Sequence, residues 1–180
     1  MKMKMSVKQL VTMAVLAALS VVIISVIKFP IIPAAPYLEY EPGDVPMLIS
    51  GFLFGPLSGM LVLVVGSVIQ ALTVSAQSGW IGLVMHLIAS GALILTSSLI
   101  YKRHKNVKGA ILGLALGCVA MTLVMIPMNL FFTVHFWGTP RDVVVAMILP
   151  VLVPFNLIKS VANSLITLLV YKSLSRWIGK

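Results

Sequence analysis

The chain has 180 residues, of which 60% are hydrophobic and 9% are charged, and its mean hydropathy is +1.12. Soluble domains carry roughly 25% charged residues, so this composition excludes a soluble enzyme, a disordered tail and a secreted disulfide scaffold. Thirteen bases against four acids give a net charge of +9, but long stretches carry no charge, so no nucleic-acid partner is expected. The composition indicates an all-α integral membrane protein with one domain over residues 1–180.

The apolar stretches predict six membrane-spanning helices, since a span needs about 20 apolar residues. Residues 45–101 contain no Asp, Glu, Lys or Arg, and this stretch could hold one, two or three crossings. Gly55-Pro56 interrupts it, because proline strains a helix, and residues 75–79 interrupt it again. We therefore expect three crossings there, the first of them short. The expected spans are 9–28, 45–55, 57–75, 80–101, 109–134 and 143–171.

The charges orient these spans, because cytoplasmic loops are enriched in Lys and Arg. With six spans, every base except Lys28, Arg141 and Lys159 falls on the cytoplasmic side, together with both termini. Two crossings within 45–101 would instead turn the basic loop 102–108 outward. The Pro-rich segment 31–44 becomes a long interfacial loop on the outside, between the first two helices, and all four acids are expected outside.

Polar side chains within the expected spans gather toward the outer side. Asn156, Lys159 and Asn163 are spaced so that they share one helix face. At about 1.5 Å per residue, Lys159 lies roughly 20 Å from Lys172 at the inner surface. Other spans contribute Gln70, Thr73, His86 and Asn129. This distribution predicts a pocket that opens to the outside, rather than a channel that is polar along its length.

Most of these residues also have a purely structural interpretation. Asn and Gln in membrane helices often only hydrogen-bond to neighbouring helices, and we interpret His86 as a packing residue. The sequence has no cluster of metal-ligating residues, so no metal site is expected. Lys159 differs, because a buried cation needs a partner. No acid lies within an expected span, so we expect Lys159 to meet a ligand, or a carboxylate that reaches it from the outer loops.

The expected lack of acids inside the membrane also narrows the solute. A strongly cationic substrate is disfavoured. A neutral or weakly acidic ring compound with imide and carbonyl groups would suit Asn, Gln and Lys side chains. Abundant Met, Leu and Phe would suit a flat aromatic body.

Small residues recur at four-residue spacing, which lets helices approach closely. We interpret two glycine series as packing within the bundle: Gly51, Gly55, Gly59 and Gly109, Gly113, Gly117. Ala14 and Ala18 on the first helix have two interpretations, packing in the bundle and docking of a partner helix.

Several motifs carry a resemblance to a known family. They are PYLEYEPGDVP at 36–46, FGPLSG at 54–59, Asn129, and PFNLIK at 154–159. With them the chain resembles, over nearly its whole length, the substrate-binding S components of energy-coupling factor (ECF) vitamin transporters, and among these the riboflavin-type group. Ala14 and Ala18 resemble that family's AxxxA contact with its coupling subunit.

The resemblance implies six helices that bind one vitamin from outside, under the loop between the first two helices. It implies a transport subunit of a bacterial plasma membrane, with neither catalytic residues nor a cofactor. Its partners would be a coupling membrane protein and two ATPases. Asn129, Asn156 and Lys159 would contact the flavin ring, and we expect three further residues to complete the site: Leu38, Asp44 and Gln70.

The sequence leaves the solute open. Where the family loop often reads Asp-Phe-Ser-Asp, this chain has EPGD at 41–44. Riboflavin, flavin mononucleotide and another vitamin-like solute all remain alternatives. A stand-alone carrier or facilitator is the second alternative. An intramembrane enzyme is disfavoured, because the serines lack a Gly-x-Ser-x-Gly setting and no nucleotide motif is present.

Overall fold

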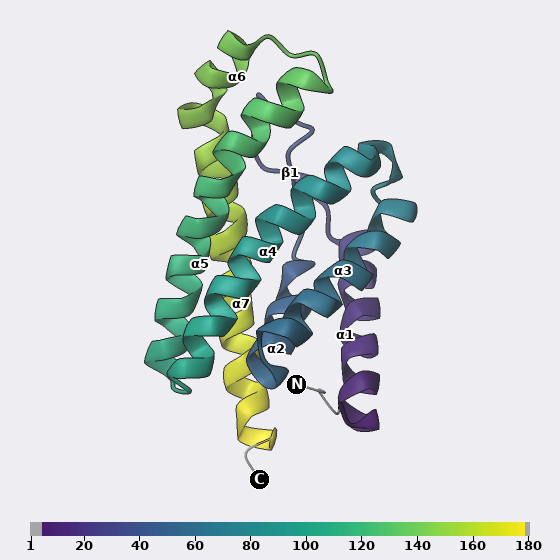
Figure 1. Cartoon of the computed structure of the whole chain (residues 1–180), viewed down its shortest axis with the longest axis vertical. Coiled ribbons are helices and arrows are strands. Elements are labelled where there is room, and N and C mark those ends of the chain that lie inside the picture. The colour runs from purple at the N-terminus through teal and green to yellow at the C-terminus, as the bar shows by residue number, and fades with distance from the viewer. Residues whose placement is uncertain (1–4, 179–180) are drawn as a thin grey trace.

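The computed structural model describes the backbone of residues 5–178 and the side chains of residues 5–173. Of the bases expected in the cytoplasm, Lys2, Lys4 and Lys180 lie outside the described residues, as does the side chain of Arg176. Within the described part, six helices run back and forth between two ends (Figure 1). They are α1 (Val7–Val26), α2 (Asp44–Phe54), α3 (Pro56–Leu72), α4 (Gly79–Arg103), α5 (Val107–Met128), and α6 (Arg141–Met147) continuing into α7 (Val153–Ile178).

Two helices are widened by a π-helical turn near a proline. The turn Asn129–Thr133 extends α5 just after Pro127, and the turn Ile148–Leu152 contains Pro150 and joins α6 to α7. Proline removes a backbone donor from the helical ladder. The helical ladder is therefore loosened at Pro150, and α6 and α7 form one continuous helix.

The helices fall into two length classes. Four segments of the described chain are long and apolar enough to cross a membrane, whereas α2 and α3 are shorter apolar helices. The 11 residues of α2 extend only about 16 Å at about 1.5 Å per residue, short of a hydrocarbon core about 30 Å thick. The expected break is at Gly55, whose φ of +96° ends α2 immediately before Pro56 begins α3.

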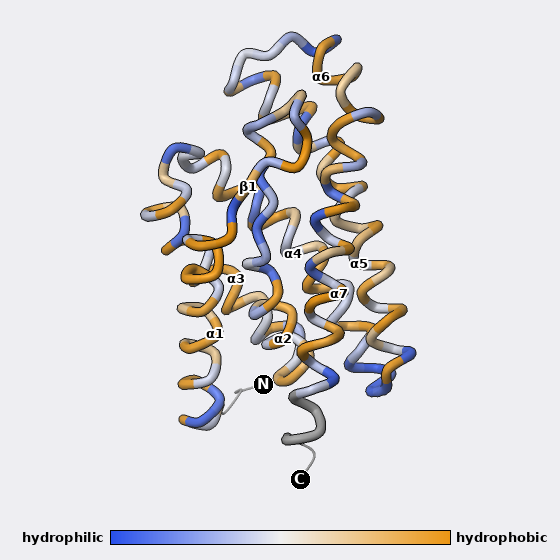
Figure 2. Tube along the Cα trace, turned by 180° about the vertical axis from the view of Figure 1, so that it is seen from behind, coloured by the Kyte–Doolittle hydropathy of each residue, from blue (hydrophilic) through white to orange (hydrophobic). Residues whose placement is uncertain are grey.

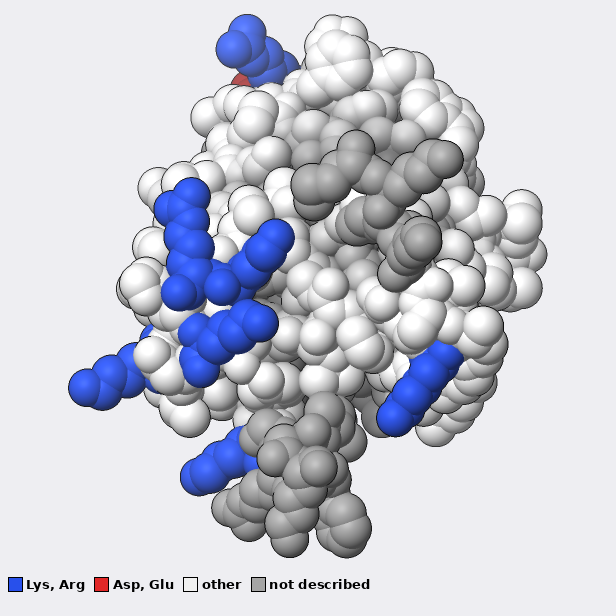
Figure 3. All heavy atoms as spheres, turned by 60° about the horizontal axis from the view of Figure 1, so that its bottom comes forward, with Lys and Arg blue, Asp and Glu red and all other residues white. Residues whose placement is uncertain are grey.

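One end of the bundle is strongly basic. We call it the basic end; it carries Lys8, the basic residues of the 102–108 loop, and Lys172. Figure 3 shows Lys and Arg side chains spread over this face, with almost no acid in view. The opposite end, here the loop end, carries α6 with Arg141 and Asp142 (Figure 1).

Part of the segment between α1 and α2 is buried within the bundle, which the sequence did not predict. Its first part forms a two-stranded antiparallel pair, β1 (Phe29–Pro30) with β2 (Glu39–Tyr40), which the sequence analysis did not anticipate. The chain then enters the bundle, where Glu41 is 7% and Asp44 1% exposed. Figure 2 shows this hydrophilic stretch running from β1 toward α2 between largely hydrophobic helices. The loop thus occupies depth that the short α2 leaves unfilled.

Four of the six glycines in the two series pack helices together, as predicted: Gly51, Gly59, Gly113 and Gly117. Gly55 instead forms the turn between α2 and α3, where a Cβ would meet nothing, and Gly109 lies against His104 of the preceding loop. A Cβ on Gly59 would lie 2.9 Å from the Cα atom of Gly51, and a Cβ on Gly117 would lie 2.9 Å from the carbonyl oxygen of Leu93. Both contacts join neighbouring helices of the bundle. On α1, by contrast, Ala14 and Ala18 are exposed, because this helix packs inward through another face that includes Ala17.

Candidate functional site

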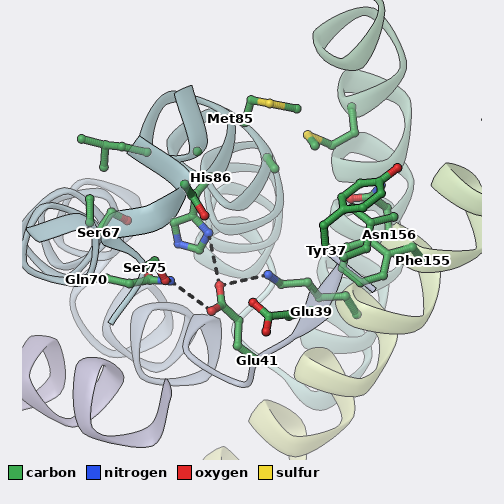
Figure 4. Close-up of a pocket in the computed structure, with 18 of the residues that line it drawn as sticks. Tyr37, Glu39, Glu41, Ser67, Gln70, Ser75, Met85, His86, Phe155 and Asn156 are labelled. Atoms are coloured by element: carbon green, nitrogen blue, oxygen red, sulfur yellow. Dashed lines mark hydrogen bonds and ion pairs between the residues drawn. The ribbon is translucent and has the colours of Figure 1, made fainter. Parts of the chain in front are cut away.

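A cavity lies at the loop end, between helices α3, α4, α5 and α7 and the segment 27–43 that joins α1 to α2, here called the loop segment. It measures about 810 Å³ when its open mouth is included. Its apolar wall is made of thioether, aromatic and aliphatic side chains, among them Met85, Met121, Met125, Phe155 and Leu38. Its polar wall includes Glu41, Gln70, His86, Asn156 and Lys159. Figure 4 shows the first four of these side chains around the cavity.

The centre of the polar wall is an ion pair between the loop and α7. The Lys159 Nζ atom donates to Glu41 Oε1 at 3.1 Å, and both side chains are almost completely buried. The second carboxylate oxygen, Oε2, accepts from Gln70 Nε2 at 3.0 Å. Gln70 Nε2 also donates to Ser75 Oγ at 3.2 Å. In Figure 4, dashed lines run to Glu41 from Gln70 and from His86.

A second acid lies directly behind this pair. The His86 ring is located between the two carboxylates, with Nδ1 3.8 Å from Glu41 Oε1 and Nε2 3.9 Å from Asp44 Oδ1. Asn163 Nδ2 donates to Asp44 Oδ2 at 3.1 Å and to the backbone carbonyl of Glu41 at 3.2 Å. The acids from the loop are therefore held by groups of α4 and α7.

The surroundings of Glu41 favour its ionised form. Burial alone raises the pKa of this carboxyl, but the charges of Lys159 and His86 and the hydrogen bonds from Lys159 and Gln70 outweigh burial. Together they lower the pKa from 4.5 to about 2. An ionised Glu41 in turn gives the buried Lys159 the counter-charge that a cation in a low-dielectric interior requires.

Four of the six predicted binding residues line the cavity. They are Leu38, Gln70, Asn156 and Lys159. Asn156 Nδ2 donates to the carbonyl of Leu152, one turn before it in the chain, which fixes the orientation of its amide at the wall. The structure thus brings together residues that lie far apart in sequence and on different elements.

The structure does not bring Asn129 and Asp44 to the cavity wall. The Asn129 amide is used within its own helix, donating to the Met125 carbonyl at 2.8 Å and accepting from Thr133 Oγ1 at 3.2 Å. The Asp44 carboxylate faces Asn163 and His86 instead of the cavity.

The expected alternative of a loop carboxylate as the partner of Lys159 is confirmed by Glu41, although sequence reasoning did not name Glu41 as a site residue and assigned His86 to packing. Glu41 and Asp44 were expected in the outer loop, and the structure buries both side chains within the bundle. The sequence argument against cationic solutes assumed that no carboxylate lies near the bound solute. That argument no longer holds, because the cavity wall contains the carboxylate of Glu41, which pairs with Lys159. The signal was available: Lys159 lacked a partner in its own span, and Glu41 lies three residues before a helix start.

The mouth of the cavity carries a separate ion pair. Lys28 Nζ lies 2.7 Å from Glu39 Oε2, and both residues line the cavity with partly exposed side chains. Each lysine that reaches the cavity is thus matched by an acid of the loop segment. Among the described residues no group of three or more His, Cys, Asp or Glu side chains could hold a metal ion.

Comparison with known proteins identifies the family. The family model for the ECF transporter, substrate-specific component, matches residues 8–171. The chain belongs to this family. It is 30% identical to the riboflavin transporter RibU of Staphylococcus aureus (strain TCH60), over 96% of this chain and 93% of that protein. It is also 30% identical to the riboflavin transporter FmnP of Bacillus subtilis (strain 168), over 97% and 95% of the two chains.

A solved structure shares the fold. It is described as the S component of a bacterial ECF transporter, has a TM-score of 0.82 and 31% identity, and is matched over 96% of this chain and 98% of that chain. S components are multi-pass membrane proteins that work with the EcfT membrane subunit and EcfA ATPases. This S component is therefore a transport subunit and not an enzyme.

Proposed function

We propose that this S component binds riboflavin or a closely related flavin in the cavity at the loop end and takes it up from the extracellular side. The observation that carries the proposal is the cavity itself, whose wall combines Gln70, Asn156 and Lys159 with methionine and aromatic side chains. The relatives named riboflavin transporters, similar over nearly the full length, support the choice of ligand.

The chemistry of the wall suits a flat ring with a polar edge. Lys159 offers donors beyond the one that Glu41 uses, and amides such as Gln70 and Asn156 offer both donors and acceptors. Met85, Met121 and Phe155 supply polarisable and aromatic surface for a ring face. We propose Leu38, Gln70, Asn156 and Lys159 as ligand contacts. The predicted contact by Asn129 would require its amide to break the hydrogen bond to the Met125 carbonyl. Asp44 would not touch the ligand and would act only through its contacts with Asn163 and His86.

A fluorescence titration tests the ligand. Purified protein without any ATPase is expected to quench riboflavin fluorescence at micromolar concentrations. Asn156→Ala is expected to weaken binding while the protein stays folded, and Thr139→Ala in the loop before α6 is a matched control outside the cavity. Absence of quenching by the folded wild-type protein, while another vitamin raises its unfolding temperature, would refute the flavin and favour the alternative of a different vitamin-like solute.

We also propose six crossings with both termini in the cytoplasm, so that the basic end faces inward. The support is the clustering of Lys and Arg at that end. Cys118 is buried and is the chain's single cysteine, so new cysteines at exposed His104 and Arg141 can be labelled separately. In intact cells an impermeant maleimide is expected to label Arg141→Cys and to spare His104→Cys; the reverse pattern would overturn the orientation.

Ala14 and Ala18 are proposed to dock the transmembrane coupling subunit, with two ATPases completing the transporter. Both alanines are exposed on α1, which leaves a close-approach surface open. Ala14→Trp is expected to reduce co-purification with the coupling subunit without changing flavin affinity, and Leu112→Trp on the exposed face of α5 is the control. Riboflavin uptake by the chain alone, with no ATPase present, would instead support a stand-alone carrier.

A further inference from the structure

The Glu41 carboxylate connects two walls of the cavity that barely touch each other. Its Oε2 atom accepts from Gln70 on α3 at 3.0 Å, and its Oε1 atom accepts from Lys159 on α7 at 3.1 Å. Helices α3 and α7 have almost no packing contact of their own. We propose that Glu41 is a positioning residue, which holds Gln70 and Lys159 at the separation and orientation that a ligand between the two walls requires.

A positioning residue must itself be fixed, and the backbone around Glu41 is. Its carbonyl accepts from Asn163 of α7 at 3.2 Å. Two residues further on, the carbonyl of Gly43 accepts from Ser20 Oγ of α1 at 2.8 Å. The carboxylate therefore projects from a segment that is bonded to the bundle on two sides. The loop thus supplies a rigid bridge at a depth where α2 has not yet begun.

The charge of Glu41 decides which groups its neighbours present to a ligand. A carboxylate only accepts hydrogen bonds, so it turns the amide nitrogen of Gln70 toward itself. The Oε1 atom of Gln70 is then left buried without a hydrogen-bond partner among the described groups. Lys159 uses one of its three donors on Glu41. The α7 wall therefore offers a donor to a ligand, while the α3 wall holds an acceptor that is buried and unused in the ligand-free protein.

Glutamine at position 41 would break this arrangement with little change in shape. Gln70 and Lys159 now donate to different oxygens of Glu41. An amide replaces one of these oxygens with an N–H donor, so one of the two partners would face a donor where it now finds an acceptor. The inference rests on the proposed function for the identity of the ligand, but the bridge itself is a property of the ligand-free protein. An experiment with two readouts separates these two parts.

The experiment is a double-mutant cycle of wild type, Glu41→Gln, Lys159→Met and the double variant. Riboflavin affinity is measured by fluorescence quenching, and the unfolding temperature is measured without ligand. Glu41→Gln is expected to weaken riboflavin binding about ten- to a hundredfold in the wild-type background, as expected for the loss of hydrogen bonds to charged groups. In the Lys159→Met background the same change is expected to weaken riboflavin binding by a clearly smaller factor, because Lys159, one of the two groups that Glu41 positions, is already gone.

Three controls keep the outcome decisive. Asp142→Asn, an exposed acid on α6, is expected to leave both readouts unchanged. Glu41→Asp keeps the charge but is one methylene group shorter; positioning predicts weakened binding by a folded protein, and wild-type affinity would overturn it. Equal effects of Glu41→Gln in both backgrounds would also overturn it. If the wild-type protein does not bind riboflavin, the proposed ligand is wrong, but the unfolding temperatures still test the bridge. Non-additive shifts of the unfolding temperature in the cycle would support it, and additive shifts would overturn it.

Discussion

At the basic end the helices meet through small residues and stacked rings, whereas at the loop end the same helices stand apart around polar groups. Phe52 of α2 stacks on Tyr101 of α4 with ring centroids 4.6 Å apart, and it meets Tyr171 of α7 edge-on at 5.5 Å. At the loop end, α4 and α7 are bridged instead by side chains that converge on Glu41. One end is closed by direct packing, and the other is held open by a charged loop.

The length of α2 explains the difference. At the basic end α2 is present and fills the centre of the bundle, with Met47, Leu48 and Phe52 buried in the core. Between Asp44 and the loop end, no helix fills the centre of the bundle, and the loop segment takes the place of α2 there. A loop cannot satisfy its backbone internally as a helix does. Side chains such as Asn163 and Ser20 satisfy it instead, which gathers polar groups around the cavity.

The largest predicted effect is the removal of the cation from the loop end. Lys159→Met leaves Glu41 buried without its counter-charge, and breaking a buried pair in this way destabilises by roughly 3–5 kcal/mol. Unfolding in detergent, followed by circular dichroism, measures the change. Lys105→Met, which removes an exposed lysine at the basic end, is expected to change stability by less than about 0.5 kcal/mol. Equal effects of the two substitutions would contradict the contrast between the ends.

The sequence predicted the helix ends and the basic loop at the basic end, but not the ring contacts among Phe52, Tyr101 and Tyr171. Gly55-Pro56 located the α2–α3 break, and the basic loop 102–108 located one end of α4 and α5. These features depend on local rules of backbone geometry and charge. The glycine spacing also predicted close packing, because a helix face without side chains lets a neighbouring backbone approach closely.

The loop end was only partly predictable. Lys159, Asn156 and Gln70 stood out because polar residues are rare within spans. Glu41 did not, because its burial depends on where a non-periodic segment runs, and no repeat in the sequence encodes that path. The hydrophilic composition of the segment favoured an exposed loop. Its buried path depends on partners far away in the sequence, above all Lys159, which lies 118 positions further along the chain.

A second prediction tests the close packing of α4 against α5. Gly117→Leu would force a side chain against the carbonyl of Leu93, a backbone atom that cannot rotate away. Overpacking of this kind destabilises by about 1–3 kcal/mol, and we expect the upper end of that range. Ala115→Leu, on the exposed face of the same helix, is the matched control. An unchanged unfolding temperature for Gly117→Leu would show that α4 and α5 can separate at this level.

A third prediction uses pH to test the role of Glu41 at the loop end. The pKa of Glu41 is lowered from 4.5 to about 2 in the folded protein, so its contribution to stability is fully present above pH 4.5 and is lost as the pH falls toward 2. By pH 3 the loss should be about 2 kcal/mol, from 1.36 kcal/mol per pKa unit. Glu41→Gln should remove this part of the acid destabilisation. Parallel pH profiles for the two proteins would contradict the assignment to Glu41.

The smallest predicted effect separates the two ends most cleanly. Tyr171→Phe removes the 2.6 Å hydrogen bond between the Tyr171 and Tyr101 hydroxyls but keeps the aromatic packing. The loss of one such bond should destabilise by about 1 kcal/mol. Riboflavin affinity should stay unchanged, because neither tyrosine lines the cavity at the loop end. A weakened affinity with an unchanged unfolding temperature would mean that the packed end adjusts the cavity through α4 and α7, since both helices carry residues of each end.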